Sequence, residues 1–170
     1  SLLHNELLAA NPHLVVVKSI SKSYGVPGIR LGVLASGNTE IIATIKKEVA
    51  IWNINSFAEF FMQIFNKYEK EYKRACERFI EERNRFYKLL CEIPFLRVIP
   101  SQANYFLVEV KKPYTANGLV LKMLKNYNIL MRDCSGKAGL QDKQYMRIAV
   151  RDQKDNDRLI NALKELESAQ

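Results

Sequence analysis

A lysine between two short apolar strands constrains this chain more than any other feature of its sequence. The run Leu14–Val17 is continuously apolar and rich in β-branched residues, which is typical of a buried strand. The stretch SISKSYGVPGIRLG follows, and the run LGVLAS predicts a second strand near residues 30–35. Glycines and a proline punctuate the turn between them, so the backbone can approach a ligand closely. We therefore interpret Lys22 as part of a site rather than as a solvated surface charge.

The polar neighbours of Lys22 indicate what chemistry such a site would perform. Ser19 and Ser21 offer hydroxyls, and Arg30 offers a guanidinium whose planar fork matches the oxygens of a phosphate. A lysine amine beside a phosphate site favours a Schiff base with a phosphorylated aldehyde cofactor.

Two motifs together resemble a known family. Ser-x-Ser-Lys, a following glycine and the later arginine resemble the cofactor-lysine motif of pyridoxal-phosphate enzymes of the aspartate-aminotransferase fold, class I/II. The stretch ILMRDCSGKAGLQDKQYMRIAVRD is similar to the branch of histidinol-phosphate aminotransferases and threonine-phosphate decarboxylases, and it leans toward the decarboxylase-like members. The resemblance covers the whole chain.

The resemblance implies a role for each residue near the first motif. Lys22 would form the Schiff base with pyridoxal 5′-phosphate and later move the proton at the substrate Cα. Ser19 and Arg30 would bind the cofactor phosphate, and Ser21 would supply a further phosphate-binding or supporting hydroxyl.

The resemblance also implies substrate-binding residues in the C-terminal part. Arg147 in YMRIAV matches the arginine that binds the substrate α-carboxylate. Arg132 in LMRDC matches an arginine that reaches a distal anionic group; an ion pair with Asp133 or Asp152 is the alternative. Asn104 in SQANYFLVEV matches a position near the active-site mouth, although an ordinary turn or strand-edge amide is equally expected there.

The chain departs from the family in its length. It has 170 residues and is much shorter than such enzymes usually are. Before Lys22 it has no counterpart of the aromatic residue that stacks on the cofactor ring, of the Asn and Tyr on the ring hydroxyl, or of the Asp on the ring nitrogen. We therefore expect the C-terminal half of such an enzyme, inactive or nearly so when alone.

The expected fold class is α/β: the C-terminal part of a pyridoxal-phosphate transferase large domain plus an α+β small domain. Residues 1–91 would form the end of the large domain with a long interdomain helix, and residues 92–170 the small domain. Trp52 and Asn53 would line the pocket or simply pack. Strands are expected at residues 14–18 and 30–35 and in FLRVI, ANYFLVEV, NILMRD and YMRIAV. Helices are expected from Asn38 or Thr39 to about Val49, from the candidate N-cap Ser56 to about Cys91, from Thr115 to Asn126 and from Asp155 to Leu166.

Composition excludes several other classes of protein. The net charge of +8 could suit nucleic acid, but much of it lies on an amphipathic helix with interspersed charges, and no nucleic-acid-binding motif is visible. Three cysteines and two histidines show no metal or redox spacing, so no metal is expected. No apolar run approaches roughly 18 residues and no signal peptide is visible. We expect a cytoplasmic homodimer that binds small molecules and neither membranes nor nucleic acid.

Three functions remain open at this point. The first is an aminotransferase that moves an amino group between an amino acid and a 2-oxo acid. The second is a decarboxylase of a phosphorylated or phosphonated amino acid on the same scaffold. The two differ in which Cα bond is aligned for cleavage. The third is a non-catalytic domain of a larger fused protein, against which the joint presence of Lys22, Arg30 and Arg147 argues.

Overall fold

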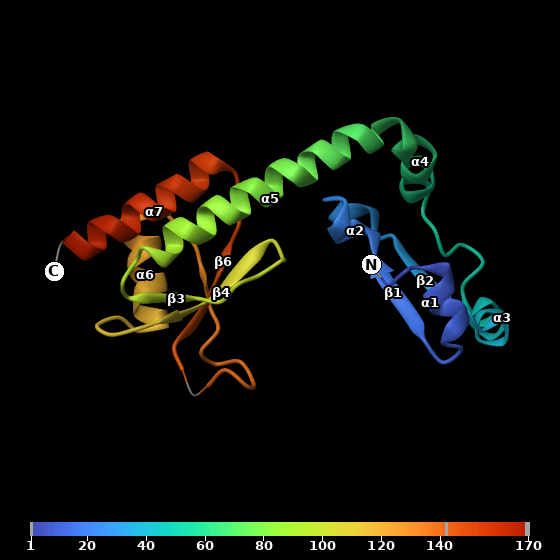
Figure 1. Cartoon of the computed structure of the whole chain (residues 1–170), viewed down its shortest axis with the longest axis horizontal. Helices are drawn as coiled ribbons and strands as arrows, with labels where there is room; N and C mark the ends of the chain where they lie inside the picture. Colours follow the sequence, from blue (N-terminus) through green and yellow to red (C-terminus); the bar gives the residue numbers. More distant parts are fainter. Residues whose placement is uncertain (1, 142, 169–170) are drawn as a thin grey trace. The chain divides into compact units, whose positions relative to one another are not determined.

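The computed structural model describes residues 2–141 and 143–168, which divide into two compact units between Arg74 and Ala75 (Figure 1). Helix α5 (Glu69–Cys91) crosses this division. The domain boundary that the sequence predicts, between residues 91 and 92, lies at the end of the same helix and stays a prediction.

The first unit is built around a two-stranded antiparallel sheet. Strands β1 (Val15–Ser19) and β2 (Gly32–Ser36) pair with Val15 opposite Ser36 and Ser19 opposite Gly32. The two predicted strands are thus confirmed, with each end displaced by one or two residues. The other elements of this unit are α1 (Asn5–Ala10), α2 (Ile20–Ser23), the 3₁₀ turn η1 (Pro27–Ile29), α3 (Thr39–Glu48), α4 (Ser56–Phe65) and the 3₁₀ turn η2 (Asn66–Tyr68).

Asparagine side chains begin both longer helices that follow this sheet. Asn38 caps α3, because its Oδ1 accepts hydrogen bonds from the N–H groups of Glu40 and Ile41 at 2.9 and 3.2 Å. Helix α4 begins in the same way with Asn55, whose Oδ1 accepts from the Ala58 N–H at 2.9 Å. The predicted N-cap Ser56 was therefore wrong by one residue, since Asn55 has the extended backbone that a cap requires.

An aromatic cluster holds the turn after β1 in place. The ring of Tyr24 contacts Phe61, Phe65 and Tyr72, with centroids 4.6 Å from those of Phe65 and Tyr72. The Tyr72 hydroxyl also donates a hydrogen bond to the Ser23 carbonyl at 3.0 Å. Large aromatic side chains bury much apolar area, so the cluster fixes the short helix α2 against α4 and the start of α5.

The second unit contains a four-stranded antiparallel sheet with the strand order β3-β4-β6-β5. Its strands β4 and β6 are central, and β3 and β5 are short edge strands. The elements of this unit after α5 are β3 (Leu96–Val98), β4 (Tyr105–Val110), α6 (Ala116–Tyr127), β5 (Arg132–Asp133), β6 (Tyr145–Ala149) and α7 (Gln153–Ser168).

Three helices and one face of this sheet enclose the core. Helices α5, α6 and α7 lie beside the sheet (Figure 1). Alternate residues of the central strands are buried, and they pack with apolar side chains of these helices. Among the most deeply buried are Phe86, Phe106, Leu119, Met146 and Leu163. The intervening strand residues point to the opposite face, which the described residues leave open.

The predicted strand in NILMRD was wrong in its first part, because only Arg132 and Asp133 pair with β6. Asn128 has a left-handed backbone (φ 53°) that ends α6, and the Ile129 N–H donates to the Met123 carbonyl at 3.2 Å. The segment before Arg132 therefore serves as the helix end. Among the described residues, no helix is long and apolar enough to cross a membrane.

Candidate functional site

Lys22 lies on α2, a single helical turn that leaves the end of β1. The backbone N–H groups of Ile20 and Ser21 both donate to the Leu31 carbonyl, at 3.0 and 3.3 Å. These bonds tie the turn to the residue before β2. The Lys22 side chain is exposed and makes no ion pair with any residue that the structure describes. The hydrogen-bonded turn thus presents the Lys22 amine to solvent.

Ser21 contributes to this turn from the inside. Its side chain is buried, and its Oγ accepts a hydrogen bond from the Leu31 N–H at 3.0 Å and donates to the Leu31 carbonyl at 3.3 Å. The geometry favours a supporting role, in which Ser21 fixes the distance between the two strand ends. A direct contact between Ser21 and a cofactor stays a prediction.

Arg30 has an unusual backbone conformation. Its φ of 56° and ψ of 40° are left-handed, which for a residue other than glycine is disfavoured by roughly 1–2 kcal/mol. The preceding carbonyl, that of Ile29, accepts a hydrogen bond from Asn55 Nδ2 at 2.8 Å. Asn55 therefore caps α4 and anchors the Arg30 turn at once. Sequence reasoning missed this residue; its only signal was an asparagine before a predicted helix.

The turn brings Ser19, Lys22 and Arg30 together in one unit. Ser19 lies opposite Gly32 in the sheet, and Arg30 precedes Leu31, the residue that receives the backbone bonds of the turn. All three side chains are exposed and have no hydrogen-bond or ion-pair partner within the described part of the chain. A hydroxyl, an amine and a guanidinium at one turn have the chemistry that a phosphorylated aldehyde requires.

In the second unit, Arg132 and Arg147 lie directly opposite each other on β5 and β6. Directly opposed residues of antiparallel strands have Cβ atoms about 4.5–5.5 Å apart and share a face of the sheet. Both arginines are exposed on the open face, and the Arg147 guanidinium lies 5.2 Å from the Tyr105 ring centre. Opposed like charges destabilise a sheet, so this pair suits an anionic ligand.

The acids proposed as alternative partners of Arg132 are engaged elsewhere. Asp133 accepts hydrogen bonds from the Ser135 hydroxyl and N–H, and these bonds hold the pKa of the Asp133 carboxyl below its usual value. Asp152 accepts from the Asp155 N–H at 2.8 Å, at the start of α7. Within the described residues, no carboxylate pairs with Arg132 or Arg147.

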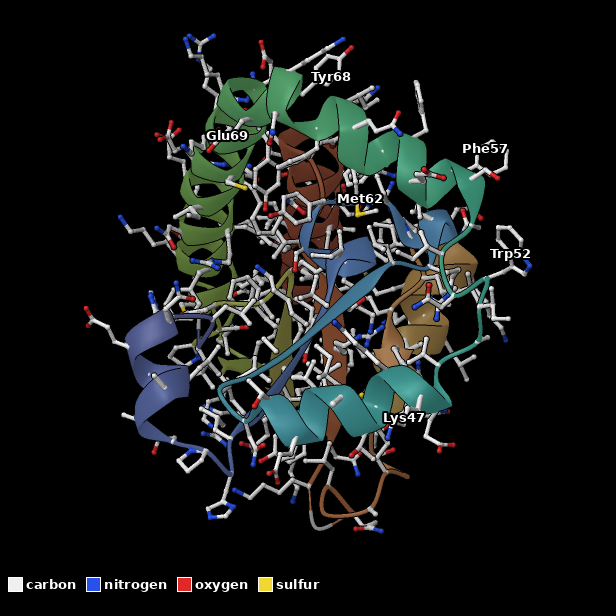
Figure 2. All side chains as sticks on the ribbon, turned by 90° about the vertical axis from the view of Figure 1, so that its right-hand side faces the viewer. Lys47, Trp52, Phe57, Met62, Tyr68 and Glu69 are labelled. Carbon is white, nitrogen blue, oxygen red and sulfur yellow. The ribbon has the colours of Figure 1, made fainter. Side chains whose placement is uncertain are left out.

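The remaining predicted residues are exposed. The Asn104 carbonyl accepts a hydrogen bond from the Val150 N–H at 2.9 Å, so its backbone extends the pairing of β4 and β6. Trp52 is 91% exposed and projects from the ribbon, as Phe57 does at 80% (Figure 2). Simple packing of Trp52 within the described chain is therefore not observed. Pocket roles for Asn104, Trp52 and Asn53 stay predictions.

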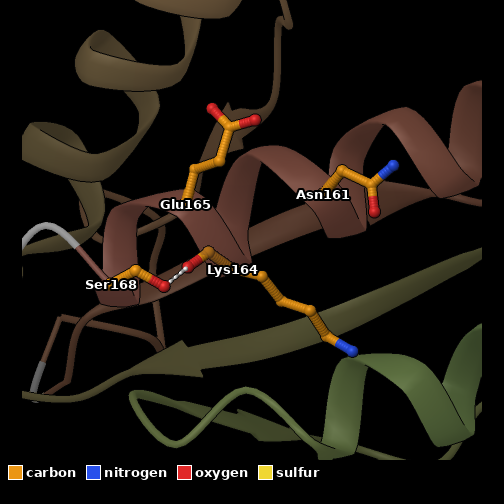
Figure 3. Close-up of a pocket in the computed structure, with 4 residues that line it drawn as sticks. All are labelled: Asn161, Lys164, Glu165 and Ser168. Carbon is orange, nitrogen blue, oxygen red and sulfur yellow. Dashed lines mark hydrogen bonds between the residues drawn. The ribbon is translucent and has the colours of Figure 1, made fainter.

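A surface hollow on α7 does not coincide with these residues. It has a volume of about 540 Å³ and is lined by Asn161, Lys164, Glu165 and Ser168 (Figure 3). Lys164 is paired with Glu92 at 3.0 Å. None of the lining residues is a predicted site residue, so we assign no function to this hollow.

Comparisons with known proteins match nearly the whole chain. The model of the family described as aminotransferase class I and II matches residues 5–163. Threonine-phosphate decarboxylase of Salmonella typhimurium is 32% identical over 158 residues, which cover 92% of this chain and 42% of that protein. Histidinol-phosphate aminotransferase of Parabacteroides distasonis is 35% identical over 164 residues, which cover 94% of this chain and 44% of that protein.

A solved structure has the same fold as this chain. The histidinol-phosphate aminotransferase from Clostridium acetobutylicum superposes with a TM-score of 0.85 at 32% identity, covering 95% of this chain and 48% of that chain. The fold class expected from the sequence is thereby confirmed. The chain spans less than half the length of the curated relatives that it matches.

Proposed function

The chain belongs to the class I and II aminotransferase family, and from this membership we propose that it is the C-terminal portion of a pyridoxal-phosphate-dependent aminotransferase. The cofactor of this family is pyridoxal 5′-phosphate. The proposed reaction moves an amino group between an amino acid and a 2-oxo acid. The turn after β1 carries this proposal, because it presents Ser19, Lys22 and Arg30 with no protein partner among the described residues.

Each group of this turn has a distinct task. When bound, pyridoxal phosphate supplies an electron sink that weakens the bonds at the substrate Cα. Lys22 Nζ would hold the aldehyde carbon covalently, then serve as the base that moves the Cα proton. Ser19 Oγ and the Arg30 guanidinium would bind the phosphate, and Ser21 and Asn55 would keep the turn rigid beneath them.

Arg30→Ala should weaken cofactor retention roughly 10- to 150-fold in the complete enzyme. A charge-assisted hydrogen bond contributes about 1.5–3 kcal/mol, and each 1.4 kcal/mol corresponds to about tenfold in affinity. The measurement is the dissociation constant of pyridoxal phosphate, followed by its absorbance. Arg74→Ala is the matched control, since Arg74 is exposed on α5 and makes no hydrogen bond or ion pair with the turn among the described residues. Unchanged affinity for Arg30→Ala would remove Arg30 from the phosphate site.

The substrate is proposed to carry two anionic groups. Arg147 would bind the α-carboxylate through its guanidinium fork, and Arg132 would bind a distal phosphate or phosphonate. The opposed arginines support this assignment, because they lack an acidic partner within the described residues. Relatives on both sides of the family are named for phosphorylated compounds, as histidinol-phosphate aminotransferase and threonine-phosphate decarboxylase are.

Decarboxylation of such a substrate is the second candidate reaction. The match to threonine-phosphate decarboxylase favours it, together with the RDCSG stretch that begins with β5. Product analysis separates the two reactions in the complete enzyme. An aminotransferase converts the added 2-oxo acid to an amino acid and releases no carbon dioxide, whereas a decarboxylase releases carbon dioxide and an amine. Absence of both products with a panel of phosphorylated amino acids would overturn both candidates.

The complete enzyme is further proposed to be a cytoplasmic homodimer. The connection before α4 exposes Ile51 at 92% and Trp52 at 91%, and Phe57 and Phe60 are exposed on the helix that follows. Trp52 and Phe57 both project from the ribbon (Figure 2). Large apolar side chains left exposed so close together in the sequence support an interaction surface here. Trp52→Asp should therefore shift sedimentation velocity toward the monomer, whereas Lys47→Asp on α3 should leave the dimer intact. A monomeric parent protein would refute the proposal.

A further inference from the structure

Arg132 is held by very little regular structure. Strand β5 contains only Arg132 and Asp133, and it lies at an edge of the sheet with β6 as its one neighbour in the described chain. Beyond it, the Cys134 N–H donates to the Tyr145 carbonyl at 2.8 Å. Because Arg147 carries a like charge directly opposite, repulsion favours displacement of Arg132 away from the sheet.

Asp133 accepts three hydrogen bonds, two that shape the turn after β5 and one, from α6, that opposes this displacement. Its Oδ1 accepts from the Ser135 N–H at 2.9 Å and from the Ser135 hydroxyl at 2.7 Å. Its Oδ2 accepts from Asn117 Nδ2 at 3.3 Å, and Asn117 lies in the first turn of α6. Side chains alternate along a strand, so Asp133 reaches α6 while Arg132 faces the open side.

The other end of the connection to β6 is tied to the same helical turn. Gln144 Oε1 accepts a hydrogen bond from the Ala116 N–H at 3.0 Å, and the Gln144 carbonyl accepts from the Val110 N–H at 2.7 Å. Both ends of the connection therefore take their position from α6, which packs in the core through Leu119 and Met123. A rigid element thus determines where Arg132 lies.

We propose that Asp133 is a positioning residue that holds Arg132 for the distal anionic group of the substrate and thereby makes the site selective for phosphorylated amino acids. This inference rests on the proposed function and deepens it. The carboxylate of Asp133 accepts hydrogen bonds from Ser135 and Asn117 and forms no ion pair with Arg132 among the described residues, so the Arg132 guanidinium stays available to an anion. A site whose charged group is held in place before binding loses less freedom when the ligand arrives.

The first arm of the test compares substrates in the complete enzyme. Asp133→Ala should lower kcat/KM for a phosphorylated amino acid roughly 10- to 100-fold, mainly through KM, and spare its neutral analogue, because small displacements of a binding group have effects of this size. Combining it with Arg132→Ala should add nothing further. Asp133→Asn should fall between, since its one carbonyl oxygen still serves Ser135. Asp155→Ala is the control, because Asp155 lies on α7 and pairs with Arg151, away from β5.

The second arm measures the strand itself, again in the complete enzyme. Amide hydrogen exchange at Cys134 reports the bond to Tyr145, and Asp133→Ala should accelerate it, whereas Asp155→Ala should not. Unchanged exchange would overturn the inference whatever the substrate is. The inference would also be overturned if exchange is faster in Asp133→Ala but this variant keeps its preference for the phosphorylated substrate, while Arg132→Ala loses that preference. If Arg132→Ala lowers kcat/KM equally for the phosphorylated amino acid and its neutral analogue, the proposed substrate class is wrong, and so is the selectivity role of Asp133. Amide exchange at Cys134 would still be faster in Asp133→Ala, so this failure can be told apart from a failure of the positioning role.

Discussion

Replacing Lys22 with alanine in the complete enzyme will abolish covalent capture of pyridoxal phosphate and lower kcat by roughly 10²- to 10⁴-fold or more. Loss of a positioned acid–base group alone accounts for a decrease of this size. Lys22→Arg should be equally inactive, because a guanidinium stays protonated and cannot serve as nucleophile or base. Borohydride reduction of the wild-type enzyme, followed by peptide mass mapping, should place the cofactor on the peptide that contains SISKSYG.

Lys18→Ala is the matched control for this experiment. Lys18 lies on β1, and its amine lies 5.9 Å from the centre of the Tyr24 ring. Its replacement should leave covalent capture intact, because its side chain is not on the exposed turn of α2. Capture of the cofactor on Lys18, or on any lysine other than Lys22, would refute the assignment of the site.

The second large effect is expected at the opposed arginines. Arg147→Lys should lower kcat/KM for every amino-acid substrate roughly 10- to 150-fold, since lysine cannot reproduce a bidentate contact of about 1.5–3 kcal/mol. Arg132→Ala should have an effect of this size on phosphorylated substrates only. Steady-state kinetics with a phosphorylated amino acid and its neutral analogue gives, for each substrate, the ratio of kcat/KM in the variant to that in the wild type.

Arg97→Ala provides the control on the same face of the sheet. Arg97 lies on β3 and is paired with Glu109 on β4, so its charge is already balanced. An exposed pair of this kind contributes about 0–1 kcal/mol to stability, and its loss should change neither kinetic ratio. Equal loss on both substrate types in Arg132→Ala would remove Arg132 from the site.

Local sequence signals were sufficient for the elements that carry the predicted residues. The β-branched run before Lys22 and the glycines after it correctly predicted two strands joined by a turn. The strands expected in NILMRD and YMRIAV include Arg132 and Arg147, and the pairing of β5 with β6 brings these two residues to one face. In both places the spacing along the chain determines which side chains meet, so no distant contact had to be known.

The features that sequence reasoning missed depend on contacts between distant residues. The bond from Asn55 to the Ile29 carbonyl joins two turns, and nothing near Asn55 predicts it. Asn55 and Ser56 are both good caps, so only the backbone of the folded chain distinguishes them. The first half of NILMRD has the composition of a strand, but it follows a left-handed Asn128 and is used to end α6.

The two sheets differ in how they protect their edges, and this difference bears on aggregation. The sheet of the second unit ends in β3 and β5, strands too short to template pairing with another chain. Strands β1 and β2 are longer, have no further strand partner in the described chain, and expose Val17 at 73% and Val33 at 42%. A two-stranded sheet is marginally stable alone. When folding of the chain stalls, edge-to-edge association will therefore begin at residues 15–36, next to the turn that carries Lys22.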